Sequence, residues 1–173
     1  LSFVPRYIRG IAIEEDVNEL KFYSNLSSMV SLYGSKQKNS VSTKEQVINA
    51  LRMRPELLIV GEMRGEEAKE LFSGANLGIP FFTTMHSNDS EMSLIKRLLV
   101  RPMSVDPQAL SSLDISIQMS SKGIESREIA EITEYKWLSR AEILDGGIRV
   151  GDDMLRIDPI SVNSAVNPNL LKE

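Results

Sequence analysis

The sequence contains no cysteine, a single histidine (His86) and few aromatic residues, 6% of the total. The absence of cysteine excludes disulfide scaffolds and metal centres built on thiolates. No apolar run reaches the roughly 20 residues that a membrane-spanning helix needs, and no signal-peptide pattern opens the chain. The net charge of −4 argues against a dedicated nucleic-acid surface. These absences favour a cytoplasmic protein.

The chain has enough apolar residues for a core. Hydrophobic residues make up 42% of the 173 positions, which suits a soluble globular domain. The first residue is Leu1 rather than methionine, so we expect a fragment or a processed chain.

Short apolar strands alternate with helical patterns over the first two thirds of the chain. Strands are predicted over 11–14, 57–60 and 81–85. The run 57–60 is apolar at every position, which is typical of a strand covered on both faces, and 81–85 is interpreted in the same way. The alternation predicts an α/β fold with a mostly parallel sheet flanked by helices.

Three helices are predicted around these strands. The first begins at the capping box of Ser42 and Glu45 and ends before Pro55. The second closes near Gly78, and the third stops near Pro102. The residues predicted to face the core are Ala68, Leu71, Phe72 and Ala75 in the second helix and Met92, Ile95, Leu98 and Leu99 in the third.

The pattern changes in the last third of the chain. The predicted elements are a short helix over 107–113, a strand over 115–119 and hairpin strands over 128–135, 136–144 and 148–150. The serine-rich stretch 24–42 is interpreted as a polar, irregular connection, and the tail from Pro159 as loosely ordered. We assign residues 1–121 to the main domain and 122–173 to a β-hairpin extension with its tail.

Reactive side chains follow three of the predicted strands. Glu15 and Asp16 come after the first strand, Glu62 after the second, and His86 after the third. Ligands of parallel α/β sheets bind outside the carboxyl ends of the strands, so we expect these groups to meet at one edge.

Each of these residues also has an ordinary structural interpretation. Glu15 can belong to a solvated turn, and His86 can be a polar residue with satisfied hydrogen bonds. Arg64 can pair with Glu66 or Glu67, and the arginines before Pro55 can be a solvated helix end. A carboxylate at the edge of a core, as at Glu62, needs partners and is harder to explain this way.

Three stretches together resemble the motor ATPases of type II and type IV secretion, pilus and archaellum machines, including their archaeal secretion members. Residues 13–20 resemble the family's aspartate box, and residues 50–68 its atypical Walker B region, in which glycine stands in place of aspartate. Residues 83–87 resemble its histidine box. The resemblance covers about residues 10 to 120, with Glu15 matching the family's catalytic glutamate by its spacing to Glu19 and Leu20.

The sequence also departs from the family pattern. Ile79 follows Gly78 where the family often has a Gly-His pair, Ser87 replaces a common alanine, and Glu14 is an extra acid. The P-loop, G-x-x-x-x-G-K-[ST], is absent, since no Gly-Lys dipeptide occurs. The resemblance therefore implies the C-terminal portion of a RecA-like domain without its Walker A motif, which we expect upstream of Leu1.

The resemblance implies roles for the residues at the predicted edge. ATP and Mg²⁺ would be the cofactors. Glu15 would position or deprotonate the attacking water, Glu62 would hold the Mg²⁺ shell through water, and His86 would sense the γ-phosphate. Further cofactor-binding candidates are Asp16, Arg64 and Thr83.

The resemblance also implies partners. The family works as hexameric rings against a membrane-embedded platform protein, at the inner face of the cell membrane and without nucleic acid. Arg52 and Arg54 are candidates for arginines donated by a neighbouring subunit. We expect the chain alone, lacking a P-loop, to be inactive.

Three other functions remain open at this stage. The chain can be a non-catalytic assembly or interaction module on the same fold. A metal-dependent hydrolase using Glu15, Asp16, Glu62 and His86 is disfavoured because closely spaced ligand pairs are absent. A nucleic-acid translocase is disfavoured by the acidic charge.

Overall fold

The computed structural model describes residues 4–15, 30–34, 40–86, 91–121, 127–138, 148–150 and 153–160. The chain divides into two compact units, Leu1–Ser112 and Leu113–Glu173. Strand β5 (Ile115–Ser121) falls in the second unit, whereas the sequence analysis grouped it with the main domain. The domain boundary predicted after residue 121 stays a prediction.

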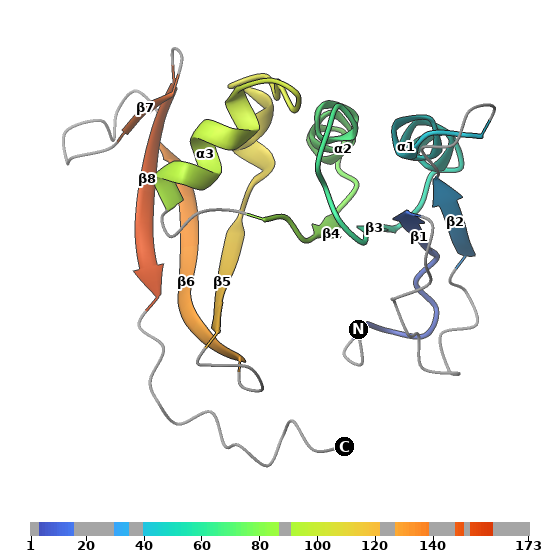
Figure 1. The fold of residues 1–173 in the computed structure, drawn as a ribbon, viewed down its shortest axis with the longest axis horizontal. Helices are drawn as coiled ribbons and strands as arrows, with labels where there is room; N and C mark the ends of the chain where they lie inside the picture. The colour runs from blue at the N-terminus through green and yellow to red at the C-terminus, as the bar shows by residue number, and fades with distance from the viewer. Residues whose placement is uncertain are drawn as a thin grey trace. The chain divides into compact units, whose positions relative to one another are not determined.

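The first unit is built on a parallel sheet, as predicted (Figure 1). Its strands are β1 (Gly10–Glu15), β2 (Val30–Gly34), β3 (Leu57–Val60) and β4 (Phe81–Thr83), in the order β2-β1-β3-β4. All four residues of β3 are buried, and so are the first five of β1. Burial of both faces explains why β3 is apolar at every position.

Strand β2 was not predicted, because it lies inside the serine-rich stretch that we interpreted as irregular. Its backbone pairs in parallel with β1, from Ile11 opposite Val30 to Glu15 opposite Gly34. Val30 and Tyr33 are residue types that favour strands, and pairing with the buried β1 outweighs the serine-rich surroundings.

Strand β4 differs from its predicted form as well. It ends at Thr83 rather than Met85, and Phe82 is 59% exposed. In the described part of the sheet β4 has a hydrogen-bonded neighbour, β3, on one side only, which accounts for this exposure.

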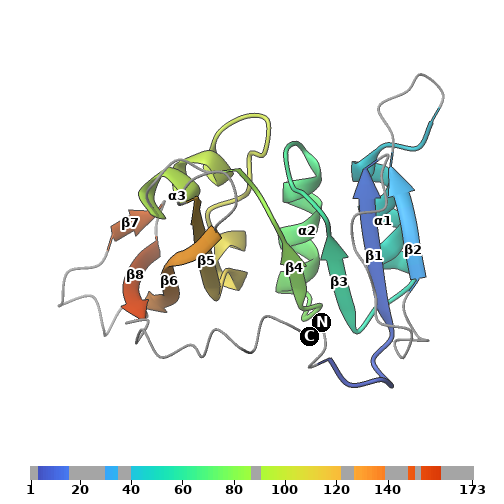
Figure 2. The same cartoon turned by 60° about the horizontal axis from the view of Figure 1, so that its bottom comes forward.

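Two helices, α1 (Thr43–Arg52) and α2 (Glu67–Asn76), cover one face of this sheet (Figure 2). They pack closely because Gly74 has no side chain: a Cβ there would lie 2.4 Å from Leu51 Cδ2. The predicted core residues Ala68, Leu71 and Phe72 are buried, and Phe72 meets Phe81 edge to face with ring centroids 5.2 Å apart.

The first unit continues with α3 (Glu91–Leu99) and a 3₁₀ turn, η1 (Ala109–Ser112). Ile95 and Leu98 of α3 are buried, as predicted, and Leu110 of η1 is fully buried. The predicted helix over 107–113 therefore contracts to a single 3₁₀ turn.

The second unit is an antiparallel sheet in the order β5-β6-β8-β7, with β6 (Arg127–Leu138), β7 (Ile148–Val150) and β8 (Asp153–Ile160). The hairpin predicted between 135 and 136 is wrong, because β6 runs straight through that point. Pairing with β5 on one side and β8 on the other holds it extended. Pro159, where the loosely ordered tail was predicted to begin, belongs to β8. The tail beyond residue 160 lies outside the described residues.

Within the described residues, no helix is both long and apolar enough to span a membrane.

The capping box that starts α1 supports a stability prediction. The Ser42 hydroxyl accepts the Glu45 N–H at 3.2 Å, and Glu45 Oε2 accepts the Ser42 N–H at 2.8 Å. We expect Ser42→Ala to lower the free energy of unfolding by about 1 kcal/mol in urea titrations, because one N–H at the helix start loses its partner. Ser73→Ala, in the exposed middle of α2, is the control and should change stability by less than about 0.5 kcal/mol; equal losses for both variants would contradict the prediction.

Candidate functional site

Three adjacent strands place the predicted residues at one edge of the first unit's sheet. Glu15 ends β1, Glu62 lies two residues after β3, and His86 lies three residues after β4. Because β1, β3 and β4 are parallel neighbours, their carboxyl ends face the same way. Glu15, Glu62 and His86 are therefore brought to one region, as the sequence predicted.

Arg64 lies between the two carboxylates. Its guanidinium bonds Glu62 Oε2 through Nη2, and its Nη1 is 4.0 Å from Glu15 Oε2. The other oxygen of Glu62, Oε1, is 3.4 Å from His86 Nε2. Glu62 thus connects an arginine on its own loop with the histidine from the neighbouring strand.

These side chains surround a hollow of about 190 Å³, lined by Glu15, Thr43, Glu62, Arg64, Gly65 and Glu67. The Glu15 and Glu62 side chains are about a quarter exposed, whereas His86, beside Glu62, is 84% exposed. The two carboxylates are partly shielded and lie near one guanidinium. They remain open to solvent and can accept hydrogen bonds.

The loop after β3 is tied to the strand on each side. The Gly61 N–H donates to Ile13 O at 2.8 Å, and the Met63 N–H donates to Thr84 O at 2.8 Å. The Thr84 hydroxyl donates to Gly61 O at 2.7 Å. Together with the burial of Met63, these bonds fix the position of Glu62 between β1 and β4.

Three residues of the hollow, Thr43, Gly65 and Glu67, were not predicted as part of the site. Thr43 arrives from the first turn of α1, and Glu67 from the first turn of α2. The sequence analysis considered Glu67 only as an ordinary ion-pair partner of Arg64. Glu67 instead accepts the Arg64 backbone N–H, and Glu66 pairs with Lys44 at 2.8 Å.

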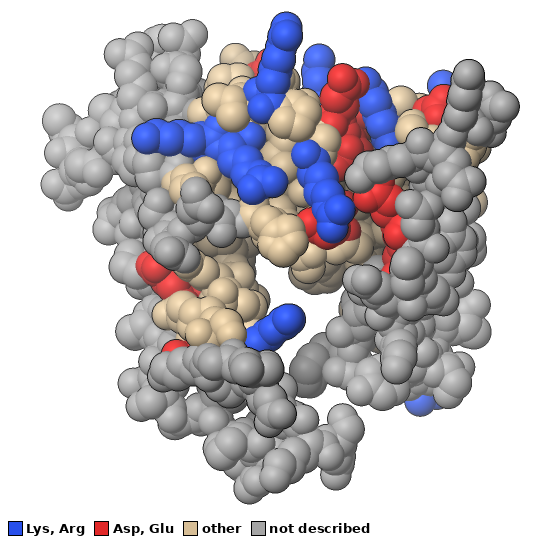
Figure 3. All heavy atoms as spheres, viewed as in Figure 1, with Lys and Arg blue, Asp and Glu red and all other residues tan. Residues whose placement is uncertain are grey.

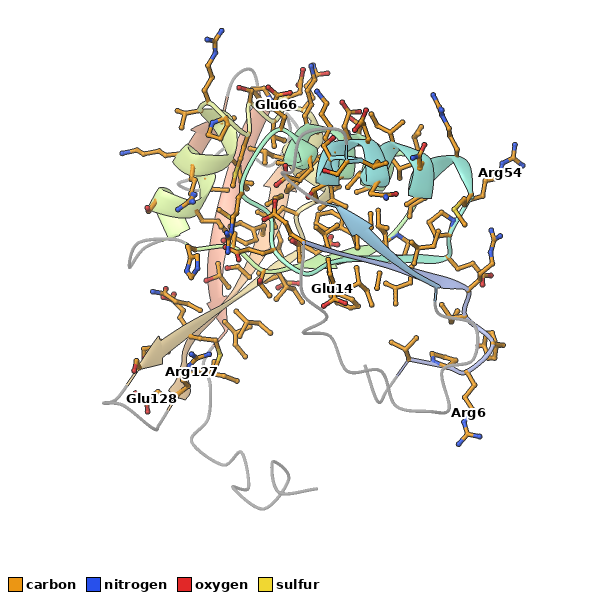
Figure 4. The ribbon with its side chains drawn as sticks, turned by 45° about the vertical axis from the view of Figure 1, so that its right-hand side comes forward. Arg6, Glu14, Arg54, Glu66, Arg127 and Glu128 are labelled. Atoms are coloured by element: carbon orange, nitrogen blue, oxygen red, sulfur yellow. The ribbon has the colours of Figure 1, made fainter. Side chains whose placement is uncertain are left out.

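Some predicted residues lie elsewhere. Thr83 does not line the hollow, and its hydroxyl donates to Thr84 O at 3.3 Å. Asp16 lies outside the described residues. Arg54 follows α1, near the start of β3, and extends outward (Figure 4); Arg52 and Arg54 therefore take no part in this hollow within one chain. Glu14 is buried, so it is Glu15 that lines the hollow.

The carboxylates of the hollow offer a divalent cation few direct ligands. In the described residues, no cluster of three or more carboxylate or imidazole groups is arranged to hold a metal directly. Glu15 and Glu62 alone, beside an open hollow, suit a hydrated Mg²⁺ held through water rather than a metal held entirely by side chains.

A second hollow of the first unit, about 550 Å³, has Lys44, Lys69 and Arg101 in its wall together with Glu66. Basic and acidic side chains lie beside one another over the helices in Figure 3. The Lys44–Glu66 pair raises the pKa of Lys44 and lowers that of Glu66, because each charge stabilises the other through a shared hydrogen bond. This hollow therefore contains a solvated ion pair and no catalytic grouping.

Comparison with known proteins identifies the family. Residues 1–127 match the sequence profile of the family described as "Type II/IV secretion system protein". The chain belongs to this family. The matched residues include the whole of the hollow described above.

Two curated relatives of this type II/IV secretion system chain are 31% identical to it. One is an uncharacterized protein of Methanocaldococcus jannaschii, aligned over 142 residues that cover 77% of this chain and 52% of the relative. The other is the conjugal transfer protein TrbB of Rhizobium radiobacter, aligned over 134 residues that cover 73% of this chain and 40% of TrbB. The chain thus spans about half or less of the length of these relatives.

Solved structures show the same fold. The VirB11 ATPase of the Brucella suis type IV secretion system, crystallised with sulphate, matches with a TM-score of 0.59 and 24% identity, over 75% of this chain and 40% of VirB11. The ATPase DotB of Legionella pneumophila matches with a TM-score of 0.53 and 23% identity, over 72% of this chain and 36% of DotB. The α/β fold expected for this type II/IV secretion system chain is thereby confirmed.

Proposed function

We propose that this chain forms the hydrolytic edge of a Mg²⁺-dependent ATPase, which in the full-length protein powers secretion or the assembly of a pilus or archaellum. The convergence of Glu15, Glu62 and His86 around Arg64 carries this proposal. Family membership supports it, as does the ATPase activity named for VirB11 and DotB.

Phosphoryl transfer depends mainly on positioning and on compensation of charge, and Glu15 and Glu62 of the hollow each have a part in it. The Glu15 carboxylate orients a water and accepts its proton. Glu62 accepts hydrogen bonds from waters of the metal shell. Glu62 would hold Mg²⁺ through water, and the ion would supply positive charge against that of the phosphates.

The exposed residues at the rim contact the nucleotide. His86 is largely solvent-accessible and donates a hydrogen bond to the terminal phosphate. Because its Nε2 lies 3.4 Å from Glu62 Oε1, a movement of His86 toward the phosphate changes its contact with Glu62. The Arg64 guanidinium carries the positive charge nearest the hollow and turns toward phosphate oxygens. Asp16 and Thr83 complete the proposed cofactor-binding set.

Residues that are not in this chain complete the site. A P-loop must hold the phosphates through its backbone N–H groups and its lysine, and the chain contains no such motif. We further propose a hexameric ring in which Arg52 or Arg54 approaches a neighbour's nucleotide, and a membrane-embedded platform protein as the partner. The protein then acts in the cytoplasm, peripherally at the inner face of the membrane and without nucleic acid.

The test is Mg²⁺-dependent ATP hydrolysis by the purified full-length protein, with His86→Ala as the diagnostic variant. We expect kcat to fall about tenfold or more, because a donor to the developing phosphate charge is lost. Nucleotide binding, followed with a fluorescent ATP analogue, should change little.

Ser111→Ala in η1, which does not line the hollow and whose hydroxyl donates to Gln108 O at 2.8 Å, is the control and should match the unaltered protein. A full-length protein that hydrolyses no ATP in any assembly state would overturn the proposal and favour a non-catalytic assembly module.

A further inference from the structure

Glu67 is a charged residue with only 8% of its surface exposed, yet it does not pair with the cation next to it in the hollow. One of its oxygens, Oε1, accepts two consecutive backbone N–H groups, from Arg64 at 2.6 Å and from Gly65 at 2.7 Å. Hydrogen bonds to an ionised acceptor are short and strong, and two on one oxygen hold a turn in a single conformation. Glu67 therefore binds the backbone of the loop that carries Arg64.

The neighbouring glycine leaves room for this carboxylate. A Cβ at Gly65 would lie 3.0 Å from Glu67 Oε2, which is closer than nearly all real contacts of this kind. The start of α2, the glycine and the buried carboxylate thus fit together as one compact turn.

The adjacent acid, Glu66, differs from Glu67 in exposure and in its partner. Its side chain is 69% exposed, points outward (Figure 4) and pairs with Lys44 on α1. Since both acids lie at the beginning of α2, both interact with the helix dipole, but only Glu67 reaches the loop.

We propose that Glu67 is a positioning residue of the ATPase site. By holding the Arg64 and Gly65 N–H groups, it fixes the backbone from which the Arg64 side chain reaches Glu62 and Glu15. This inference rests on the proposed function, because it assigns Glu67 a part in the same site. In this role Glu67 acts through Arg64 rather than on the nucleotide.

The first experiment measures the loop without reference to activity. In the full-length protein, amide hydrogen exchange at Arg64 and Gly65 is followed by mass spectrometry of short peptides or by NMR. We expect Glu67→Ala to accelerate exchange at these amides about 10- to 100-fold, since each loses a charged acceptor. Glu67→Gln keeps an amide oxygen that can accept both bonds and should restore part of the protection.

Glu66→Gln is the matched control, because it removes a charge from the same helix end without touching the loop. It should leave exchange at Arg64 and Gly65 unchanged. Unaltered exchange in Glu67→Ala would overturn the inference whether or not the protein is an ATPase.

The second experiment uses turnover. We expect Glu67→Ala to lower kcat for ATP about 10- to 100-fold, as misplacement of a site residue by about 1 Å does, with little change in KM. If Glu67 acts only through Arg64, the double variant Glu67→Ala/Arg64→Ala should be no slower than Arg64→Ala alone.

A double variant that is much slower than Arg64→Ala would show that Glu67 has a separate role and would overturn the inference. Full activity in Glu67→Ala would do the same. An inactive unaltered protein would instead overturn the proposed function, while the exchange experiment would still decide whether Glu67 holds the loop.

Discussion

Glu62→Gln in the full-length protein is expected to lower kcat for ATP hydrolysis by about 100- to 1,000-fold, the usual cost of losing a charged group that acts on the transition state. Glutamine has nearly the same shape as glutamate, so the variant removes the charge and keeps the packing. The affinity for ATP, measured by titration with a fluorescent analogue, should stay within about threefold, because the lost interaction belongs to the reacting state.

Glu62 is sensitive because it joins the other members of the site. One of its oxygens bonds Arg64 and the other lies 3.4 Å from His86. A neutral amide pairs weakly with the guanidinium. It also has one acceptor oxygen and one NH₂ donor, so it cannot face both Arg64 and His86 with an acceptor. Loss of charge at this position therefore weakens the contacts of Glu62 with both Arg64 and His86.

Glu56→Gln is the matched control for this variant. Glu56 lies just before the same strand, at its opposite end, where it accepts the Arg9 N–H at 2.8 Å. Turnover should remain close to that of the unaltered protein. If Glu62→Gln kept normal turnover, Glu62 would have to be removed from the catalytic set.

The second large effect concerns the 173-residue chain by itself. We expect it to hydrolyse no ATP and to bind ATP only weakly, although its hollow and its carboxylates are present. The reason is that phosphates are held mainly by the backbone N–H groups and lysine of a P-loop, and no Gly-Lys dipeptide occurs in the sequence.

The measurement is isothermal titration of the chain with ATP, with and without Mg²⁺, beside a phosphate-release assay. Circular dichroism of the same sample shows whether helices and strands have formed, so that weak binding is not mistaken for unfolding. The full-length protein is the positive control. Tight Mg²⁺-dependent binding by the chain alone would contradict the prediction and would require a phosphate site among these residues.

The parts of the site that were predictable are those in which sequence position determines spatial position. In a parallel sheet all carboxyl ends lie at one edge, so recognising the strands at 11–14, 57–60 and 81–85 was enough to group Glu15, Glu62 and His86. Glu67 could not be assigned in this way. Its role depends on the path of the loop before α2, and adjacent glutamates have the same local signal.

Other misses have the same origin. Strand β2 was missed because it lies in a serine-rich stretch, although Val30 and Tyr33 are residue types that favour strands, and it pairs with β1. The region of β6 was divided into two hairpin strands at 135/136, while pairing on both edges keeps it one extended strand. Phe82 was expected to be buried because its own sequence is apolar, and only the position of β4 in the sheet accounts for its exposure.

By itself, the sequence determined the start of α1 at Ser42, the doubly buried strand Leu57–Val60 and the three reactive strand ends, because each depends on hydrogen bonds or hydrophobicity within a few residues. Only the tertiary structure decided which groups pair: Arg64 with Glu62 and Glu15, Glu66 with Lys44, and Glu67 with the loop backbone. Those pairings depend on distances between segments brought together by the sheet, and a difference of one residue in the turn would exchange one carboxylate for another.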